Sequence, residues 1–249
     1  MKTVGVDLAA DPRNCGVCVL EEDVITHVTR GSRNAAHPDW LLDHCSGAQV
    51  VAVDVPFGWP KPFADALKSY EIGVALDRDR KRYLYRTTDT WITDKLPRLL
   101  AREVGPPRPL SVSADKLGVT AMVGTLLLDG LRDEFDLSPQ GDASFPAVVE
   151  VYPALSLWAW ALPHRNYKGS GGDARRNRHA LLRKLGEAFG LVFSEHEATL
   201  VDVEHCFDAL VAALTGREYA DGNTVDPQDQ DADLLRFEGW IRVPNRSLD

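Results

Sequence analysis

The sequence predicts an α/β fold, and three observations carry that prediction. Short runs rich in β-branched residues alternate with segments of helical spacing, an order typical of a sheet covered by helices. The run VVAVDVPFGWP at residues 50–60 is almost continuously apolar, as expected for a parallel strand buried on both faces. The chain has 249 residues, of which 44% are hydrophobic, so it can bury a sizeable core.

The first 56 residues are predicted to be rich in strands. TVGVDLA (3–9), GVCVLEE (16–22) and VITHVTRG (24–31) each have the composition of a short strand, and together they indicate a meander. HPDWLLDHCSG (37–47) has apolar residues near helical spacing, with Pro and Asp at its start and Gly at its end. The strand at 50–56 follows it. The expected order is strand, strand, strand, helix, strand.

The middle of the chain has a mixed pattern. It contains the helical stretch PFADALKSY (62–70), a charged segment, a Pro-rich elbow and the apolar helix TAMVGTLLLDGL (120–131). The strand pattern resumes at AVVEVYP (147–153). We therefore interpret the region between as an insertion in the sheet rather than as a separate domain.

Three helices are predicted after that strand. They are ALSLWAWALP (154–163), the basic ARRNRHALLRKLGEAFG (174–190) and VEHCFDALVAALTG (203–216). In the last of these, apolar side chains recur at the spacing of one helix face.

Composition excludes several classes of protein. No apolar run approaches the roughly 18–20 residues that span a bilayer, and Asp7 interrupts the N-terminal apolar stretch too early for a signal peptide. We expect a cytoplasmic protein with no membrane partner. Cys15 and Cys18 form a C-x-x-C, but residues three apart in a strand point to opposite faces and no second Cys/His pair has ligand spacing. Neither zinc nor a disulfide framework is predicted.

Four carboxylates stand within or beside apolar elements: Asp7, Asp54, Glu150 and Asp208. A lone carboxylate buried in a strand costs several kcal/mol unless it is paired, hydrogen-bonded or bound to a cation. If the strands that carry the first three are parallel neighbours, their carboxyl ends open onto one crevice. Oxygen ligands without a Cys/His framework favour Mg²⁺ or Mn²⁺. Taken alone, each acid is more often a cap or turn former, and Glu150 could pair with an arginine from the insertion; the metal site is predicted from the four acids together.

His205 lies three residues before Asp208, on the same face of the predicted helix. It is a candidate proton shuttle or partner of a metal ligand. A histidine on the helix surface with no role in chemistry is an equal alternative.

A set of short motifs is shared with a known family. GVDLA, AVDVPFGWP, YRTTD, EVYPALSL, YKG, FDALVAAL and EGWI occur in this order over nearly the whole chain. Together they resemble the family called domain of unknown function 429, which is predicted to be nuclease-like and is assigned to the ribonuclease H-like superfamily. The resemblance implies one domain over residues 1–249, a mixed five-stranded sheet flanked by helices, and a mainly helical insertion at about 57–145.

The resemblance also implies site residues. Asp7, Asp54 and Asp208 correspond to the acids of the superfamily's metal site. Residues 205–209 resemble the last catalytic helix of Holliday-junction resolvases. Arg86 and Lys168 match the family pattern and suit a phosphate, although an ion pair with one of the acids is an equal alternative for each.

The net charge of −9 weakens a simple nucleic-acid-binding role, but the charge is unevenly distributed. Residues 164–184 hold seven Lys and Arg against one acid, including Arg175, Arg176 and Arg178, and residues 77–102 hold eight against four. Interleaved aromatic residues would permit base stacking: Tyr83, Tyr85, Trp91 and Tyr167. Solvated helix faces are the alternative.

The leading hypothesis is a divalent-metal-dependent nuclease with a two-metal mechanism. Asp7, Asp54 and Asp208 would hold Mg²⁺ or Mn²⁺ with Glu150 completing the ligands, Lys168 would assist catalysis, and Arg86, Lys168 and the arginines at 175, 176 and 178 would bind nucleic acid. One alternative is a non-catalytic module that binds nucleic acid or protein. An actin or sugar-kinase type phosphotransferase is less favoured, because DLAADPRNCG offers only Gly16 for a phosphate loop.

Overall fold

The computed structural model describes residues 1–35, 37–72, 79–113, 115–138, 145–227 and 230–248. A mixed sheet with the strand order β3-β2-β1-β4-β5-β6 forms its centre. The first three strands are antiparallel neighbours, whereas β1, β4, β5 and β6 run parallel. The strands are β1 (Lys2–Asp7), β2 (Gly16–Glu21), β3 (Val24–Arg30), β4 (Val50–Asp54), β5 (Ala147–Val151) and β6 (Ile241–Arg242).

Helices cover both faces of this sheet, so the predicted α/β class is confirmed. The predicted order of three strands, a helix and a fourth strand is also confirmed. A series of helices, α2 to α6, separates β4 from β5. The helices are α1 (Asp39–Cys45), α2 (Lys61–Lys68), α3 (Lys81–Leu84), α4 (Thr87–Asp94), α5 (Leu96–Leu99), α6 (Asp115–Leu131), α7 (Pro153–Ala159), α8 (Gly172–Phe189), α9 (Glu197–Asp202), α10 (Glu204–Ala220) and α11 (Ala232–Glu238). None of the described helices is long and apolar enough to cross a membrane.

The expectation of five strands is wrong, because β6 adds a sixth. This strand has only two residues, and it pairs with β5 through Glu150 opposite Ile241 and Val151 opposite Arg242. A two-residue strand has no alternation to detect in the sequence. It exists because the end of the chain returns to a free sheet edge, which is a long-range effect.

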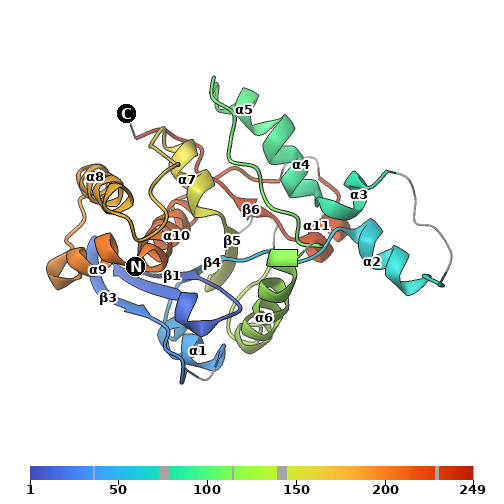
Figure 1. Ribbon diagram of the computed structural model, residues 1–249, viewed down its shortest axis with the longest axis horizontal. Coiled ribbons are helices and arrows are strands. Elements are labelled where there is room, and N and C mark those ends of the chain that lie inside the picture. Colours follow the sequence, from blue (N-terminus) through green and yellow to red (C-terminus); the bar gives the residue numbers. More distant parts are fainter. Residues whose placement is uncertain (36, 73–78, 114, 139–144, 228–229, 249) are drawn as a thin grey trace.

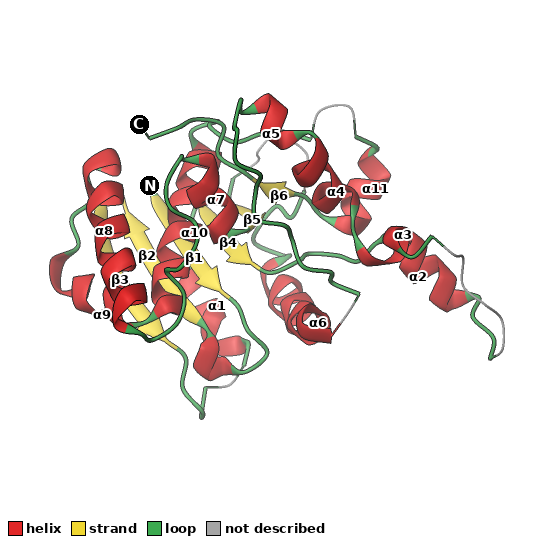
Figure 2. Cartoon of the chain, turned by 45° about the horizontal axis from the view of Figure 1, so that its top comes forward, coloured by secondary structure: helices red, strands yellow, loops and turns green. Residues whose placement is uncertain are grey.

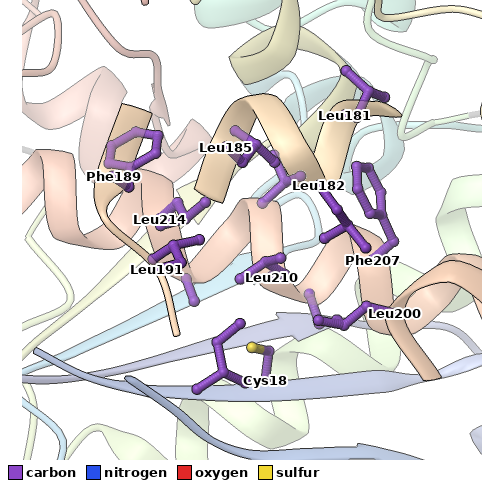
Figure 3. Packing of buried hydrophobic residues seen from close by; sticks show 14 of the residues in the cluster. Cys18, Leu181, Leu182, Leu185, Phe189, Leu191, Leu200, Phe207, Leu210 and Leu214 are labelled. Atoms are coloured by element: carbon purple, nitrogen blue, oxygen red, sulfur yellow. The ribbon is translucent and has the colours of Figure 1, made fainter. Parts of the chain in front are cut away.

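Each face of the sheet has its own core. On one face, α7, α8 and α10 pack over β2 and β3. Figure 3 shows leucines and phenylalanines of α8, α9 and α10 packed above Cys18. On the other face, valines of β1, β2, β4 and β5 pack against α1 and α6. Figures 1 and 2 show these two layers, with α1 and α6 on the side of the sheet away from α8.

The helix α10 lies unusually close to the sheet. Its contacts run mainly to β1, β2 and β4. A Cβ built on Gly5 would stand 1.9 Å from the carbonyl oxygen of Ala209, and one on Gly16 would stand 2.1 Å from that of His205. Only glycine allows two backbones to approach so closely. The two glycines therefore fix the height of α10 above the strands.

We predict that Gly5→Ala lowers the free energy of unfolding by about 3 kcal/mol or more, because the added methyl group would overlap the α10 backbone. Gly105→Ala is the matched control, since nothing lies within 4 Å of its added Cβ, and its effect should stay within about 0.5 kcal/mol. Urea unfolding followed by circular dichroism measures both. Equal stability of Gly5→Ala and the parent would contradict this packing.

Candidate functional site

Asp7 and Asp54 lie side by side at the carboxyl ends of β1 and β4. The two strands are parallel neighbours, and the register places Asp7 directly opposite Asp54. Their α-carbons are therefore separated by about one strand spacing, roughly 4.8 Å. Both side chains are on the α10 face: Gly5, two residues before Asp7, meets Ala209, and Ala52, two residues before Asp54, packs with Ala212. The predicted meeting of these two acids at one sheet edge is thus seen in the structure.

Asp208 joins them from the first turns of α10. Its side chain is almost completely buried, and both of its oxygens have partners. The Tyr167 hydroxyl donates to Oδ1 at 2.9 Å, and the Lys168 ammonium lies 2.7 Å from Oδ2. These two residues form part of the YKG motif, so the loop after α7 delivers a cation to the carboxylates of the sheet.

The loop that carries Lys168 is held by a buried arginine. Arg178 of α8 donates from Nη1 to the backbone carbonyls of Tyr167 and Gly169, the latter at 2.9 Å, and from Nε to that of Val201 at 2.7 Å. Its side chain is buried. The sequence predicted that Arg178 binds substrate. In the structure its hydrogen bonds instead hold the loop around Lys168 in place.

His205 contacts Asp7 directly. The distance from its Nδ1 to Asp7 Oδ2 is 2.7 Å, and one quarter of the imidazole side chain is exposed. Asp54 accepts no hydrogen bond from any group in the described part of the chain. The three acids therefore differ: Asp208 is paired with a lysine, Asp7 with a histidine, and Asp54 has neither.

Burial and neighbouring charge shift the pKa values of Asp7, Asp54 and Lys168. Burial raises the pKa of Asp7 to about 6; the hydrogen bond from His205 opposes this shift, and the negative charge of Asp208 adds to it. Burial and the neighbouring charge of Asp7 hold the pKa of Asp54 well above its usual range. Burial lowers the pKa of Lys168, but the charges of Asp208 and Asp54 outweigh this and raise it. Negative charge is therefore in excess at this edge, even with one lysine present.

The donor set fits a hard divalent cation. Mg²⁺ is usually held by one or two carboxylates together with water and substrate phosphate, and Asp7 and Asp54 offer such a pair. Among the described residues, however, no three acidic, histidine or cysteine side chains are arranged so that they could hold a metal ion as they stand. Asp208 could become a third ligand only if its carboxylate released Lys168 and bound the cation instead.

Glu150 stands apart from these acids because of strand parity. It is opposite Val53 in the register, and the residue before it, Val149, packs with Ala52 on the α10 face. Side chains alternate along a strand, so Glu150 points to the other face, where Val148 joins the core beneath α6. We therefore leave Glu150 out of the candidate ligand set.

Glu150 instead forms a buried ion cluster with Arg86 and Asp89. Arg86 Nη2 lies 2.7 Å from Glu150 Oε1 and 3.1 Å from Asp89 Oδ1. Arg86 is 2% exposed, and its Nη1 also donates to the backbone carbonyl of Glu238 at 3.0 Å. These charges raise the pKa of Arg86 although burial opposes the shift. The ion pair that was the alternative for Arg86 is what the structure contains, so its guanidinium is not available to a phosphate.

The same cluster ties the helices after β4 to the sheet. Glu150 Oε2 accepts from the backbone N–H of Phe57 at 3.0 Å. The Glu238 carboxylate accepts from the N–H groups of Lys61 at 2.8 Å and Thr87 at 2.6 Å. The path of the chain that leaves Asp54 is therefore fixed by charged side chains.

The remaining predicted cations are on the surface of α8. Arg175 pairs with Asp202 at 3.4 Å, and half of its side chain is exposed. Arg176 pairs with Asp173, and three quarters of its side chain is exposed. Both are open to a ligand, but each has an acidic partner. In the other basic segment, residues 77 and 78 lie outside the described residues.

Two polar residues of the site were not among the predicted ligands. Tyr167 was considered only for stacking, but its hydroxyl bonds Asp208, and burial raises its pKa well above the usual range. His205 was an open case between a surface residue and a partner of the acids. The bond to Asp7 supports the second interpretation.

Comparison with known proteins gives one match. The model of the family described as protein of unknown function DUF429 matches residues 5–232. The chain belongs to this family. The match includes Asp7, Asp54, Lys168 and Asp208, so the whole candidate site lies within the part that the family shares. No curated protein and no solved structure matches the chain.

The raised pKa of Asp7 predicts a pH-dependent stability difference. An acid whose pKa is raised on folding contributes its full stability below its unfolded pKa of 3.8 and loses it as pH rises through about 6. Between pH 5 and pH 8, without metal, the free energy of unfolding of the parent should therefore fall by about 1 kcal/mol more than that of Asp7→Asn. Urea unfolding in EDTA at the two pH values measures this. A stability gap that does not change with pH would contradict the shift.

Glu150→Gln should lower the free energy of unfolding by about 2 kcal/mol, because it removes one of the two carboxylates that neutralise the buried Arg86. The loss is smaller than for an isolated buried pair, since Asp89 keeps its own contact with Arg86. Asp65→Asn is the control: it breaks the half-exposed pair with Lys61 and should cost less than about 1 kcal/mol. Thermal unfolding distinguishes the two. An effect of Glu150→Gln no larger than that of Asp65→Asn would count against the cluster's structural role.

Proposed function

We propose that this DUF429 protein is a divalent-metal-dependent phosphodiesterase that acts on nucleic acid. The observation that carries the proposal is the convergence of Asp7, Asp54 and Asp208 at the carboxyl ends of two parallel strands, where burial and neighbouring negative charge raise the pKa values of Asp7 and Asp54. Excess buried negative charge destabilises a fold unless a cation offsets it. Perturbed carboxylates clustered at one site are typical of catalysis.

Asp7 and Asp54 would hold Mg²⁺ or Mn²⁺, with Asp208 joining when Lys168 leaves it. When bound, the cation would supply Lewis-acid activation of water and of the phosphate. Lys168 is half exposed, so its ammonium can exchange the Asp208 carboxylate for a substrate phosphate oxygen. His205 orients Asp7 through the 2.7 Å contact at Nδ1 and keeps its other ring nitrogen for proton exchange. The two-metal mechanism and the location in the cytoplasm remain predictions from the sequence.

A non-catalytic binding module is the second candidate, and one observation favours it. The Lys168 ammonium at 2.7 Å from Asp208 neutralises part of the charge without any metal. A permanent pair of this kind would leave a rigid but inactive site. The phosphotransferase alternative loses support, because Gly16 is used for contact with the α10 backbone at His205.

Cleavage assays test the proposal directly. The purified protein should cut labelled single-stranded, duplex, hybrid or branched nucleic acid in Mg²⁺ or Mn²⁺ and not in EDTA. Asp7→Asn and Asp54→Asn should each reduce the rate by at least about a hundredfold, whereas Asp129→Asn, at an exposed acid of α6, should leave it unchanged. The proposal would be contradicted if no substrate were cleaved with either metal, or if Asp7→Asn were as active as the parent.

A further inference from the structure

A large groove lies among the helices that follow β4, and the candidate mechanism does not use it. Its volume is about 1040 Å³, and it is bounded by α2, α3, α4 and α11. Figures 1 and 2 show these helices gathered at one end of the molecule, away from α8 and α9. The volume is at the upper end of the roughly 300–1,000 Å³ of small-molecule sites, so the groove has room for an extended ligand.

The groove is lined by aromatic and cationic side chains. Tyr70 is 52% and Tyr85 40% exposed, so the rings of both are accessible to a ligand. Trp91 packs against Trp240 at a centroid distance of 5.1 Å and remains half-buried at the groove wall. The lining also includes the cations Lys61, Arg82 and Lys95, together with the buried Arg86.

This combination has a chemical preference. Aromatic rings offer stacking surfaces to unpaired bases, whereas bases inside a duplex are stacked on each other and are not accessible. Lys and Arg beside the rings match the phosphates that connect the bases. Three acids, Asp65, Asp94 and the buried Glu238, also line the groove, and Asp65 pairs with Lys61. The charge is therefore mixed, so stacking must contribute more to binding than charge.

The groove is connected to the carboxylate site through the buried ion cluster. Arg86 and Glu238 form part of its lining. Arg86 is bonded to Glu150, which is opposite Val53, the residue before Asp54. The chain from Asp54 to Lys61 passes through residues 55–60 only, and this segment is anchored by Glu150 at Phe57. A ligand bound in the groove would thus contact helices that are anchored to the end of β4.

We propose that this groove binds an unpaired strand of nucleic acid by stacking its bases on Tyr70 and Tyr85. The inference rests on the proposed function, since it names the form of substrate that the phosphodiesterase would take: single-stranded or branched rather than fully paired. The groove lies on different elements from the basic helix α8, so the two surfaces can be tested separately.

Binding is measured by fluorescence anisotropy in EDTA, with a labelled oligo(dT) of about 20 nucleotides and a duplex of the same length. The parent should bind the single strand more tightly than the duplex. Tyr85→Leu and Tyr70→Leu should each weaken binding of the single strand by about tenfold. Tyr85→Phe should bind as the parent does, because it keeps the ring. Arg132→Gln, at an exposed arginine after α6 that is assigned no role in binding, should also leave this affinity unchanged.

Three results would overturn the inference: equal affinity of the leucine variants and the parent, loss of binding in a variant of the basic helix α8 (Arg176→Gln) alone, or no binding of either oligonucleotide. Because cleavage is absent in EDTA, the outcome is separate from that of the proposed function. If Tyr85→Leu binds weakly but the parent does not cleave in Mg²⁺ or Mn²⁺, the groove is supported and the proposed enzymatic activity is contradicted. If cleavage depends on Asp7 but binding is insensitive to Tyr70 and Tyr85, the enzymatic activity is supported and the groove is contradicted.

Discussion

The close contact of α10 with the sheet is the constraint on which the rest of the structure depends. Gly5 and Gly16 allow the helix backbone to approach the strands, and this approach sets Asp208 and His205 above the ends of β1 and β4. If α10 lay farther from the strands, His205 Nδ1 could not lie 2.7 Å from Asp7 Oδ2. The glycines therefore act far beyond local backbone conformation: they determine which side chains share a site.

Strand parity then divides the charged residues into two groups. Asp7 and Asp54 face α10 and meet Asp208, whereas Glu150 faces the other side and meets Arg86. The two groups differ in electrostatic balance. Arg86 is matched by buried acids and joins the helices after β4 to the sheet. The three aspartates share Lys168, which is half exposed. The Arg86 group joins parts of the fold, whereas the group of Asp7, Asp54 and Asp208 is the one to which we assign the proposed chemistry.

Much of this arrangement was predictable from sequence. Runs such as TVGVDLA and VVAVDVPFGWP identify parallel strands that end in Asp, and the pairing of Asp7 with Asp54 follows once the two strands are neighbours. The placement of Glu150 was not predicted, because it depends on the register of β5 against β4. A shift of one residue moves every side chain to the other face. Neither β6 nor the burial of Arg178 has a local signal, since both depend on contacts distant in sequence.

The groove among α2, α3, α4 and α11 shows a similar limit. The aromatic and basic composition of residues 77–102 indicated a binding surface, but composition does not determine which rings face a common space. Tyr70 comes from outside that segment, and Tyr167 is at Asp208 rather than in the groove. In three dimensions, Tyr70, Tyr85 and Trp91 line the groove, whereas Tyr167 contacts the carboxylate of Asp208.

The central claim is that Asp7 and Asp54 form the primary ligands of a divalent cation. A crystal soaked in Mn²⁺ and measured for anomalous scattering tests it most directly. We expect an anomalous peak bonded to carboxylate oxygens of both residues, with the Lys168 ammonium moved away from Asp208. A map without Mn²⁺ at this edge of the sheet, in which Lys168 still contacts Asp208, would contradict it.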